Sequence, residues 1–295
     1  MEKVFDSDLV RLHRLRARRQ AREGVDFLMR HVCDDLALRL SAVDRSFVRA
    51  ADLFSGSPLP AETLAATGRV GEILRVETAP ELLGDAAGVL AAPETVPLEP
   101  ASLDLAVSVL ALHEVDDLPG LLAQTRRALK PDGLLLAAFL GQGTLAELKE
   151  SLLAAETELS GGASPRVAPF ADIRDAGALL QRAGFALPVA DVEPVTVRYD
   201  TMFGLMRDLR GMGATSALAA RSRRPATRLL FARAAEIYAE RFADPDGRIR
   251  ATFSILWMSG WVPHASQQKP LKPGSATASL ADALAQAAEA SKKQR

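Results

Sequence analysis

Apolar residues along the first eighty positions follow first the period of a helix and then that of buried strands. A spacing of three or four residues predicts an amphipathic helix over residues 25–40. Its apolar positions are Val25, Leu28, Val32, Leu36 and Leu40. The mostly apolar run 47–54 predicts a strand, and residues 55–58 form a turn cluster after it. A short helix over 60–67 and a second strand over 73–76 follow.

A longer apolar run, residues 103–112, has the composition of a strand that helices cover on both faces. Asp117 is placed to cap the next helix, and the turn residues 130–133 separate that helix from another buried strand over 134–140. Strands that alternate with helices in this way predict right-handed crossovers and a parallel sheet.

The second half of the chain continues with helices and two longer strands. Thr144 and Glu147 have the spacing of a capping box, which predicts a helix through about residue 159. The other predicted elements are helices over 172–183, 202–209 and 227–242 and strands over 189–199 and 250–261. We therefore expect an α/β, Rossmann-like sheet of seven mostly parallel strands. The last strand should be antiparallel, with a helical insertion at about residues 200–249 before it.

By composition the chain divides into three parts. Residues 1–24 predict a basic helical arm, which is either a solvated helix or a docking arm for an acidic partner. Its arginines are Arg11, Arg14, Arg16, Arg18, Arg19 and Arg22. Residues 25–275 form the α/β domain, and the Ala-rich residues 276–295 are expected to be a frayed tail.

Composition and charge narrow the class of protein. With 36 Lys+Arg against 37 Asp+Glu, no overall field exists to recruit nucleic acid, and we expect no nucleic-acid partner. The apolar runs are too short to predict a transmembrane segment. A single cysteine, Cys33, predicts neither an internal disulfide nor a Cys-clustered metal site, so no metal is expected. With no apolar signal segment at the start, the cytoplasm is the expected compartment.

Polar residues follow two predicted strands, at the edge where an open α/β sheet binds its ligand. Asp52 ends the first strand, Gly56 lies in the turn after it, and Glu77 ends the second strand. A carboxylate there can accept hydrogen bonds from both ribose hydroxyls of an adenosine ligand, and a glycine lets the backbone approach the ligand. For Glu77 alone, a solvated strand end is an equally good interpretation.

His113 and Glu114 end the apolar run that begins at residue 103, at the same edge of the sheet. The histidine is the candidate catalytic residue, either as a general base or in the wall of a substrate pocket. A packing or hydrogen-bonding role is the alternative.

Two groups of motifs carry a family resemblance. The stretches Leu103 to Val115 and Leu129 to Gly133 are similar to the fourth- and fifth-strand motifs of class I S-adenosylmethionine-dependent methyltransferases of biotin and ubiquinone synthesis. The second half resembles one subfamily, the methyltransferase-like assembly factor of respiratory complex I, known as an arginine hydroxylase of an iron–sulfur subunit. The motifs include Ser164-Pro165-Arg166-Val167-Ala168-Pro169-Phe170, Arg182-Ala183-Gly184-Phe185, Gly211-Met212-Gly213, Asp246-Gly247, Gly260-Trp261 and Gly274-Ser275-Ala276.

The resemblance implies S-adenosylmethionine as cofactor. The expected cofactor-binding residues are Asp52, Phe54, Gly56, Glu77, Ser108 and Leu110. The chain departs from the family where Phe54 and Pro58 replace glycines and where Ala92 replaces the acid that meets the adenine amine. We expect Phe54 and Pro58 to crowd the methionine part of the ligand. The alternative is that the Phe54 ring turns into the core and leaves the pocket open.

Two functions follow from the resemblance. The first is a methyltransferase-like enzyme, a methyltransferase or an arginine hydroxylase, that modifies a protein client such as the iron–sulfur subunit of complex I. The second is a non-catalytic assembly factor with a degenerate cofactor loop. We favour the enzyme because Asp52, Gly56 and Glu77 occur together. The client is expected to bind residues 164–213 and the arginine-rich helix, and to hold the protein at the inner membrane.

Overall fold

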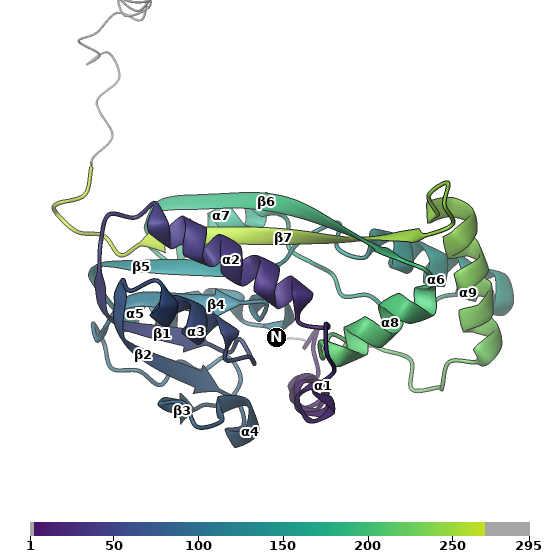
Figure 1. The fold of residues 1–295 in the computed structure, drawn as a ribbon, viewed down its shortest axis with the longest axis horizontal. Helices are drawn as coiled ribbons and strands as arrows, with labels where there is room; N and C mark the ends of the chain where they lie inside the picture. Colours follow the sequence, from purple (N-terminus) through teal and green to yellow (C-terminus); the bar gives the residue numbers. More distant parts are fainter. Residues whose placement is uncertain (1–2, 269–295) are drawn as a thin grey trace, which may run out of the picture. The chain divides into compact units, whose positions relative to one another are not determined.

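A computed structural model describes residues 3–268 of the chain, and its sheet has seven strands in the order β3-β2-β1-β4-β5-β7-β6 (Figure 1). The strands are β1 Phe47–Leu53, β2 Val70–Glu77, β3 Gly88–Leu90, β4 Leu103–Val109, β5 Leu129–Leu140, β6 Ala186–Tyr199 and β7 Ile249–Trp261. Neighbours from β3 to β5 pair in parallel, and β7 is antiparallel to both β5 and β6. The predicted fold class, including the antiparallel last strand, is confirmed. A separate unit begins at His264.

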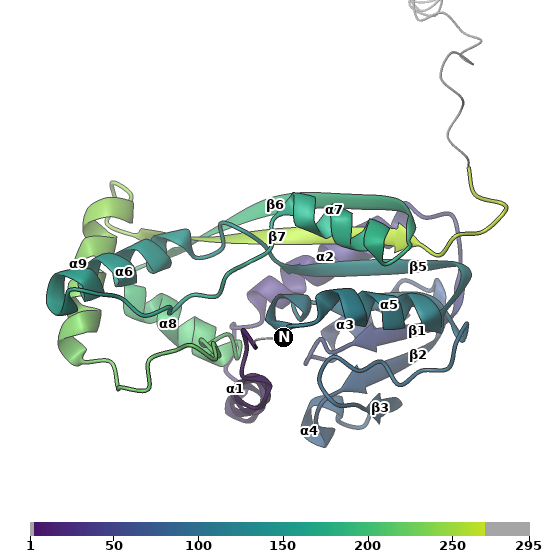
Figure 2. The same ribbon diagram turned by 180° about the vertical axis from the view of Figure 1, so that it is seen from behind.

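Helices cover both faces of this sheet. α2 (Phe27–Ser41) and α3 (Leu59–Ala66) pack on one face, and α5 (Leu118–Ala128) and α7 (Ile173–Arg182) pack on the other (Figures 1 and 2). In β5, Leu134 and Leu136 belong to the first core, whereas Leu135 and Phe139 belong to the second. Since successive strand residues face opposite sides, an unbroken apolar run is what a doubly covered strand needs.

The remaining helices lie near the carboxyl ends of the parallel strands. α6 (Ala146–Ser160), α8 (Met202–Gly211) and α9 (Arg228–Phe242) stand beside the long ends of β6 and β7 (Figure 1). α8 and α9 form the predicted insertion before β7. α1 (Ser7–Gln20) contacts α8 and also the short helix α4 (Pro80–Leu83) that follows β2. The tail predicted at 276–295 lies outside the described residues.

Two local predictions need correction, and one short strand was not predicted. His113 does not close a strand, because β4 ends at Val109 and residues 112–114 form a single 3₁₀ turn. Residues 130–133 are not a turn between helix and strand, because β5 begins at Leu129 and includes them. They form an irregularity within it, with Asp132 at φ 63° and a register shift against β4. β3 is only three residues long, too short to leave an apolar pattern.

The predicted capping box at Thr144 and Glu147 is also wrong, because both side chains bond to β7 instead. Ser254 N donates to Thr144 Oγ1 at 3.1 Å, and Thr252 N donates to Glu147 Oε2 at 3.3 Å. The N-cap of α6 is Leu145, which makes no side-chain cap. The same residue types at the same spacing thus anchor the helix start to the neighbouring strand.

This anchor predicts a measurable loss of stability in Thr144→Val. The substitution leaves the buried Ser254 N–H without its acceptor, which should lower the free energy of unfolding by about 1–3 kcal/mol. Thr157→Val is the matched control, since this exposed α6 hydroxyl bonds only to its own helix, and its effect should stay within about 0.5 kcal/mol. Chemical denaturation measures both, and equal losses would contradict the anchoring role.

Candidate functional site

Three charged side chains form a buried cluster at the carboxyl ends of β1 and β2. Asp52 and Arg75 are register partners on the two strands, and Glu77 follows on the same face as Arg75. Arg75 Nε lies 3.3 Å from Asp52 Oδ2, and Arg75 Nη2 lies 2.7 Å from Glu77 Oε1. All three side chains are at most 2% exposed. The cluster therefore holds two carboxylates against one guanidinium without water.

Burial sets the protonation of this cluster. Loss of water raises the pKa of both Asp52 and Glu77, and the Arg75 charge opposes that rise. Ser55 also donates a hydrogen bond to Asp52, which favours the ionised form. Because burial dominates, the pKa of each carboxyl stays above its ordinary value.

Glu77 also holds the loop that follows β1. Gly56 N donates to Glu77 Oε1 at 2.8 Å, and Gly56 has a φ of 69°, which favours glycine. Glu77 Oε2 is buried and has no hydrogen-bond partner among the described residues. This oxygen can therefore accept a further hydrogen bond, although Glu77 itself lines neither of the two pockets described below.

The other expected cofactor residues take different positions. The Phe54 ring is 6% exposed and belongs to the core under α5, although its φ of 61° is unusual for a side chain of this size. The prediction that it crowds the ligand is therefore wrong, and the alternative of a ring turned into the core is correct.

Pro58 does line the pocket beside the loop and is the N-cap residue of α3. Ser108 Oγ donates to Leu53 O at 2.8 Å, which ties β4 to β1. Leu110 lines the same pocket as Pro58.

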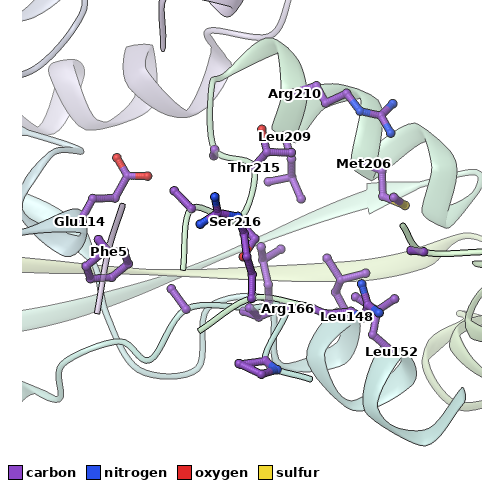
Figure 3. Close-up of a pocket in the computed structure, with 18 of the residues that line it drawn as sticks. Phe5, Glu114, Leu148, Leu152, Arg166, Met206, Leu209, Arg210, Thr215 and Ser216 are labelled. Atoms are coloured by element: carbon purple, nitrogen blue, oxygen red, sulfur yellow. The ribbon is translucent and has the colours of Figure 1, made fainter. Parts of the chain in front are cut away.

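Two cavities meet at this edge of the sheet. The first, here called the loop pocket, has a volume of about 580 Å³ and is lined by the loop Ser55–Leu59 and by residues of α1 and α2. The second, here called the helix pocket, measures about 340 Å³. Figure 3 shows Leu148 and Leu152 on one side of it and Met206 and Leu209 on the other. The residues that line both pockets are His113, Glu114, Leu140 and Ala214.

His113 is the titratable group on this common wall. The residue is partly exposed, but its Nδ1 is buried and has no partner among the described residues, and its ring lies 6.1 Å from that of Phe170. Burial lowers the pKa of His113 to about 4, so the imidazole is neutral near pH 7. A neutral imidazole on this wall can accept a proton from a group in either pocket.

The arginine-rich helix α1 closes the site from outside. Arg14 Nη1 donates to Phe54 O at 2.8 Å, and Arg14 Nη2 lies 2.8 Å from Glu114 Oε2. Arg14 is 15% exposed, so it is not part of a solvated helix face, and Arg18 and Arg22 line the loop pocket. The sequence predicted either a solvated helix or a docking arm for an acidic partner, and neither prediction has an arginine that turns inward against the site.

The motif Gly211-Met212-Gly213 explains how α1 comes so close. A Cβ at Gly211 would lie 2.7 Å from Val25 Cγ1, and one at Gly213 would lie 3.1 Å from Arg14 Cα. Gly213 also has a φ of 77°. Both glycines therefore let the N-terminal segment rest directly on the end of α8.

Sequence reasoning missed two residues of this site. Arg75 left a signal, since an arginine two positions before Glu77 in a short apolar strand shares its face and is a candidate buried ion pair. Arg14 left none, because nothing in a run of arginines marks the one that turns inward.

Within residues 3–268, no group of three or more His, Cys, Asp or Glu side chains is arranged to hold a metal ion. In the same range, no helix has the length and apolar character needed to cross a membrane.

The arrangement partly fits an adenosine ligand with a methionine tail. Gly56 lines the loop pocket, and the buried Glu77 behind it accepts the Gly56 N–H and keeps one oxygen without a hydrogen-bond partner among the described residues. The side chains of Asp52 and Ser108 form hydrogen bonds to other residues of the protein, so they support the site and do not bind the ligand.

The comparisons agree with this geometry. Residues 52–137 match the family model of the methyltransferase domain. A human relative named "Arginine-hydroxylase NDUFAF5, mitochondrial" is 38% identical over 287 residues, which are 95% of this chain and 83% of the relative. A "Malonyl-[acyl-carrier protein] O-methyltransferase" of Laribacter hongkongensis is 34% identical over 84% of this chain and 86% of its own.

The solved structure of the YcgJ protein from Bacillus subtilis has a TM-score of 0.54 at 14% identity, covering 80% of this chain and all of that one. A putative methyltransferase from Bacillus halodurans has the same TM-score and covers 78% of this chain. Both likenesses concern the fold, which is that of class I methyltransferases. By sequence, the chain belongs to the methyltransferase-like family that contains the NDUFAF5 arginine hydroxylases.

Proposed function

We propose that this protein binds S-adenosylmethionine in the loop pocket and modifies a side chain of a protein client that enters the helix pocket. The observation that carries the proposal is the common wall, where the neutral imidazole of His113 lies between the two cavities. Methyl transfer chiefly requires an acceptor aligned beside the donor in a site that excludes water. Two adjoining pockets supply that arrangement.

In this proposal each residue has a defined task. Glu77 holds the ribose, Gly56 and Leu110 line the cofactor pocket, and His113 accepts a proton from the acceptor group. When bound, S-adenosylmethionine would supply an electrophilic methyl group.

The client that we propose is an arginine-bearing subunit of respiratory complex I, in particular the iron–sulfur subunit implied by the sequence resemblance. Arginine hydroxylases among the relatives support an arginine acceptor. We place the protein in the cytoplasm, held at the inner membrane by its client. Mass spectrometry of the co-expressed client tests this, since an added methyl group and an added oxygen give different masses, and an unmodified client would contradict enzymatic action.

Glu77→Gln tests the cofactor half of the proposal. The exchange removes the charge that receives the ribose hydroxyls, so binding of S-adenosylmethionine should weaken by about 1.5–3 kcal/mol. Titration calorimetry measures this, with the exposed Glu72→Gln of the same strand as control. Unchanged affinity in a folded Glu77→Gln protein would assign Glu77 to the buried cluster alone.

The second candidate function is a non-catalytic assembly factor. The observation that favours it is the commitment of Glu77 to Arg75 and Gly56, with Arg14 lying over the loop. Such a protein would bind the client with wild-type strength but show no affinity for S-adenosylmethionine. The same titration therefore separates the two functions.

A further inference from the structure

Glu114 is the carboxylate that faces the acceptor side of the site. Among the described residues that line the helix pocket it is the only acid, whereas Arg166, Arg210, Arg221 and Arg224 are cationic. Arg166 is paired with Glu156 and Arg221 with Asp6. A cationic acceptor entering this pocket would therefore find its counter-charge at Glu114 and be repelled elsewhere.

Arg14 shows what this carboxylate can hold. Its guanidinium reaches Glu114 with one nitrogen and the Phe54 carbonyl with the other, each at 2.8 Å. The two acceptors lie in turns that follow different strands. The side chains of Arg14 and Glu114 are at most 15% exposed. A carboxylate and a carbonyl set at this spacing match the two-pronged donor geometry of a guanidinium.

We propose that Glu114 and the Phe54 carbonyl form the binding site for the guanidinium of a client arginine, and that Arg14 occupies this site as an internal substitute until the client displaces it. The proposal rests on the proposed function in one respect, the arginine acceptor. It adds the residues that receive the acceptor and a contact that holds the free protein closed.

The energetics of exchange favour such a device. Breaking a buried ion pair is costly because the remaining charge has no partner, but replacing one guanidinium by another never leaves Glu114 unpaired. α1 has no buried residue of its own, so its outward movement uncovers little apolar surface. Glu114 also lies with His113 on the wall common to both pockets, beside the proposed methyl donor.

The test is calorimetric titration of the full chain, without cofactor, using N-acetyl-arginine amide as the probe. Arg14→Gln should bind the probe about 10- to 100-fold more tightly than the wild type, the range for hydrogen bonds to a charged group. The control Arg16→Gln, an exposed position on the same helix, should bind like the wild type. The neutral analogue N-acetyl-citrulline amide should show no gain.

The gain in affinity for the arginine probe must also depend on Glu114. The double variant Arg14→Gln with Glu114→Gln should therefore show no such gain. If Arg14→Gln does not fold by circular dichroism, Arg14→Lys replaces it, because the ammonium keeps the charge but cannot reach both acceptors. A folded variant that binds no more tightly than Arg16→Gln, or a gain that survives Glu114→Gln, overturns the proposal. Because no cofactor is present, these results are independent of S-adenosylmethionine binding.

Discussion

Arg75→Met should lower the free energy of unfolding by about 3–5 kcal/mol, the range for removing one partner of a buried ion pair. The substitution preserves the unbranched stem but leaves Asp52 and Glu77 facing each other without a cation. It also removes the hydrogen bonds that Arg75 donates to the Leu82, Leu83 and Ser57 carbonyls. Chemical denaturation of the purified variant measures the loss.

The control is Arg241→Met, which breaks a pair with Glu150 in which both side chains are about half exposed. Its cost should stay below about 1 kcal/mol because water screens such pairs. Adding Asp52→Asn and Glu77→Gln to Arg75→Met should recover most of the stability, since no buried charge then remains. Equal losses in the two single variants, or no recovery in the triple variant, would assign Arg75 a packing role only.

The pH dependence gives a further check on the same cluster. A carboxyl whose pKa is higher in the folded than in the unfolded protein contributes stability at low pH and loses it as pH rises through the folded pKa. Arg75→Met removes the charge that opposes this rise. The deficit of the variant should therefore be larger at pH 8 than at pH 5, and the opposite trend would contradict the assignment of the raised pKa.

His113→Asn should reduce the rate of client modification by about 10²–10⁴-fold, the usual contribution of a positioned general base. The amide keeps a polar group of similar size on the common wall but cannot take up the acceptor proton. Affinity for S-adenosylmethionine should change little, because the role lies in the reaction and not in cofactor binding. Timed mass spectrometry of the client provides the rate.

His31→Asn is the matched control, since His31 is 43% exposed and pairs with Glu193 on the surface. The His31→Asn variant should modify the client at the wild-type rate. A loss smaller than about tenfold in His113→Asn, with cofactor affinity intact, would return His113 to a packing role.

The low pKa of His113 adds a stability effect with a definite sign. The unfolded protein binds a proton at the ordinary histidine pKa of 6.5, whereas the folded protein does so only at about 4. Stability should therefore fall as pH decreases through this window, and His113→Asn should lose less of it. A variant with the acid sensitivity of the wild type would show that the imidazole is already accessible to protons.

Local patterns predicted the parts of this fold that follow from periodicity. The run 103–112 and the helix 25–40 were placed within a few residues, because burial on two faces or on one stripe imposes apolar residues at fixed spacing. Thr144 and Glu147 show where such reasoning ends. The residue types and spacing of a capping box were present, but the closer partners were on β7, more than a hundred residues away.

By itself the sequence determined the longer strands of the sheet, the edge at which a ligand would bind, and the candidates Asp52, Gly56, Glu77 and His113, because these depend on apolar runs and on the polar residues at or soon after their ends. Only the tertiary structure decided what each one does. It turned Phe54 into the core, buried Asp52 and Glu77 around Arg75, and brought Arg14 onto Glu114. The physical reason is that charge pairing and burial depend on residues distant along the chain, and local spacing carries no record of which distant side chain arrives.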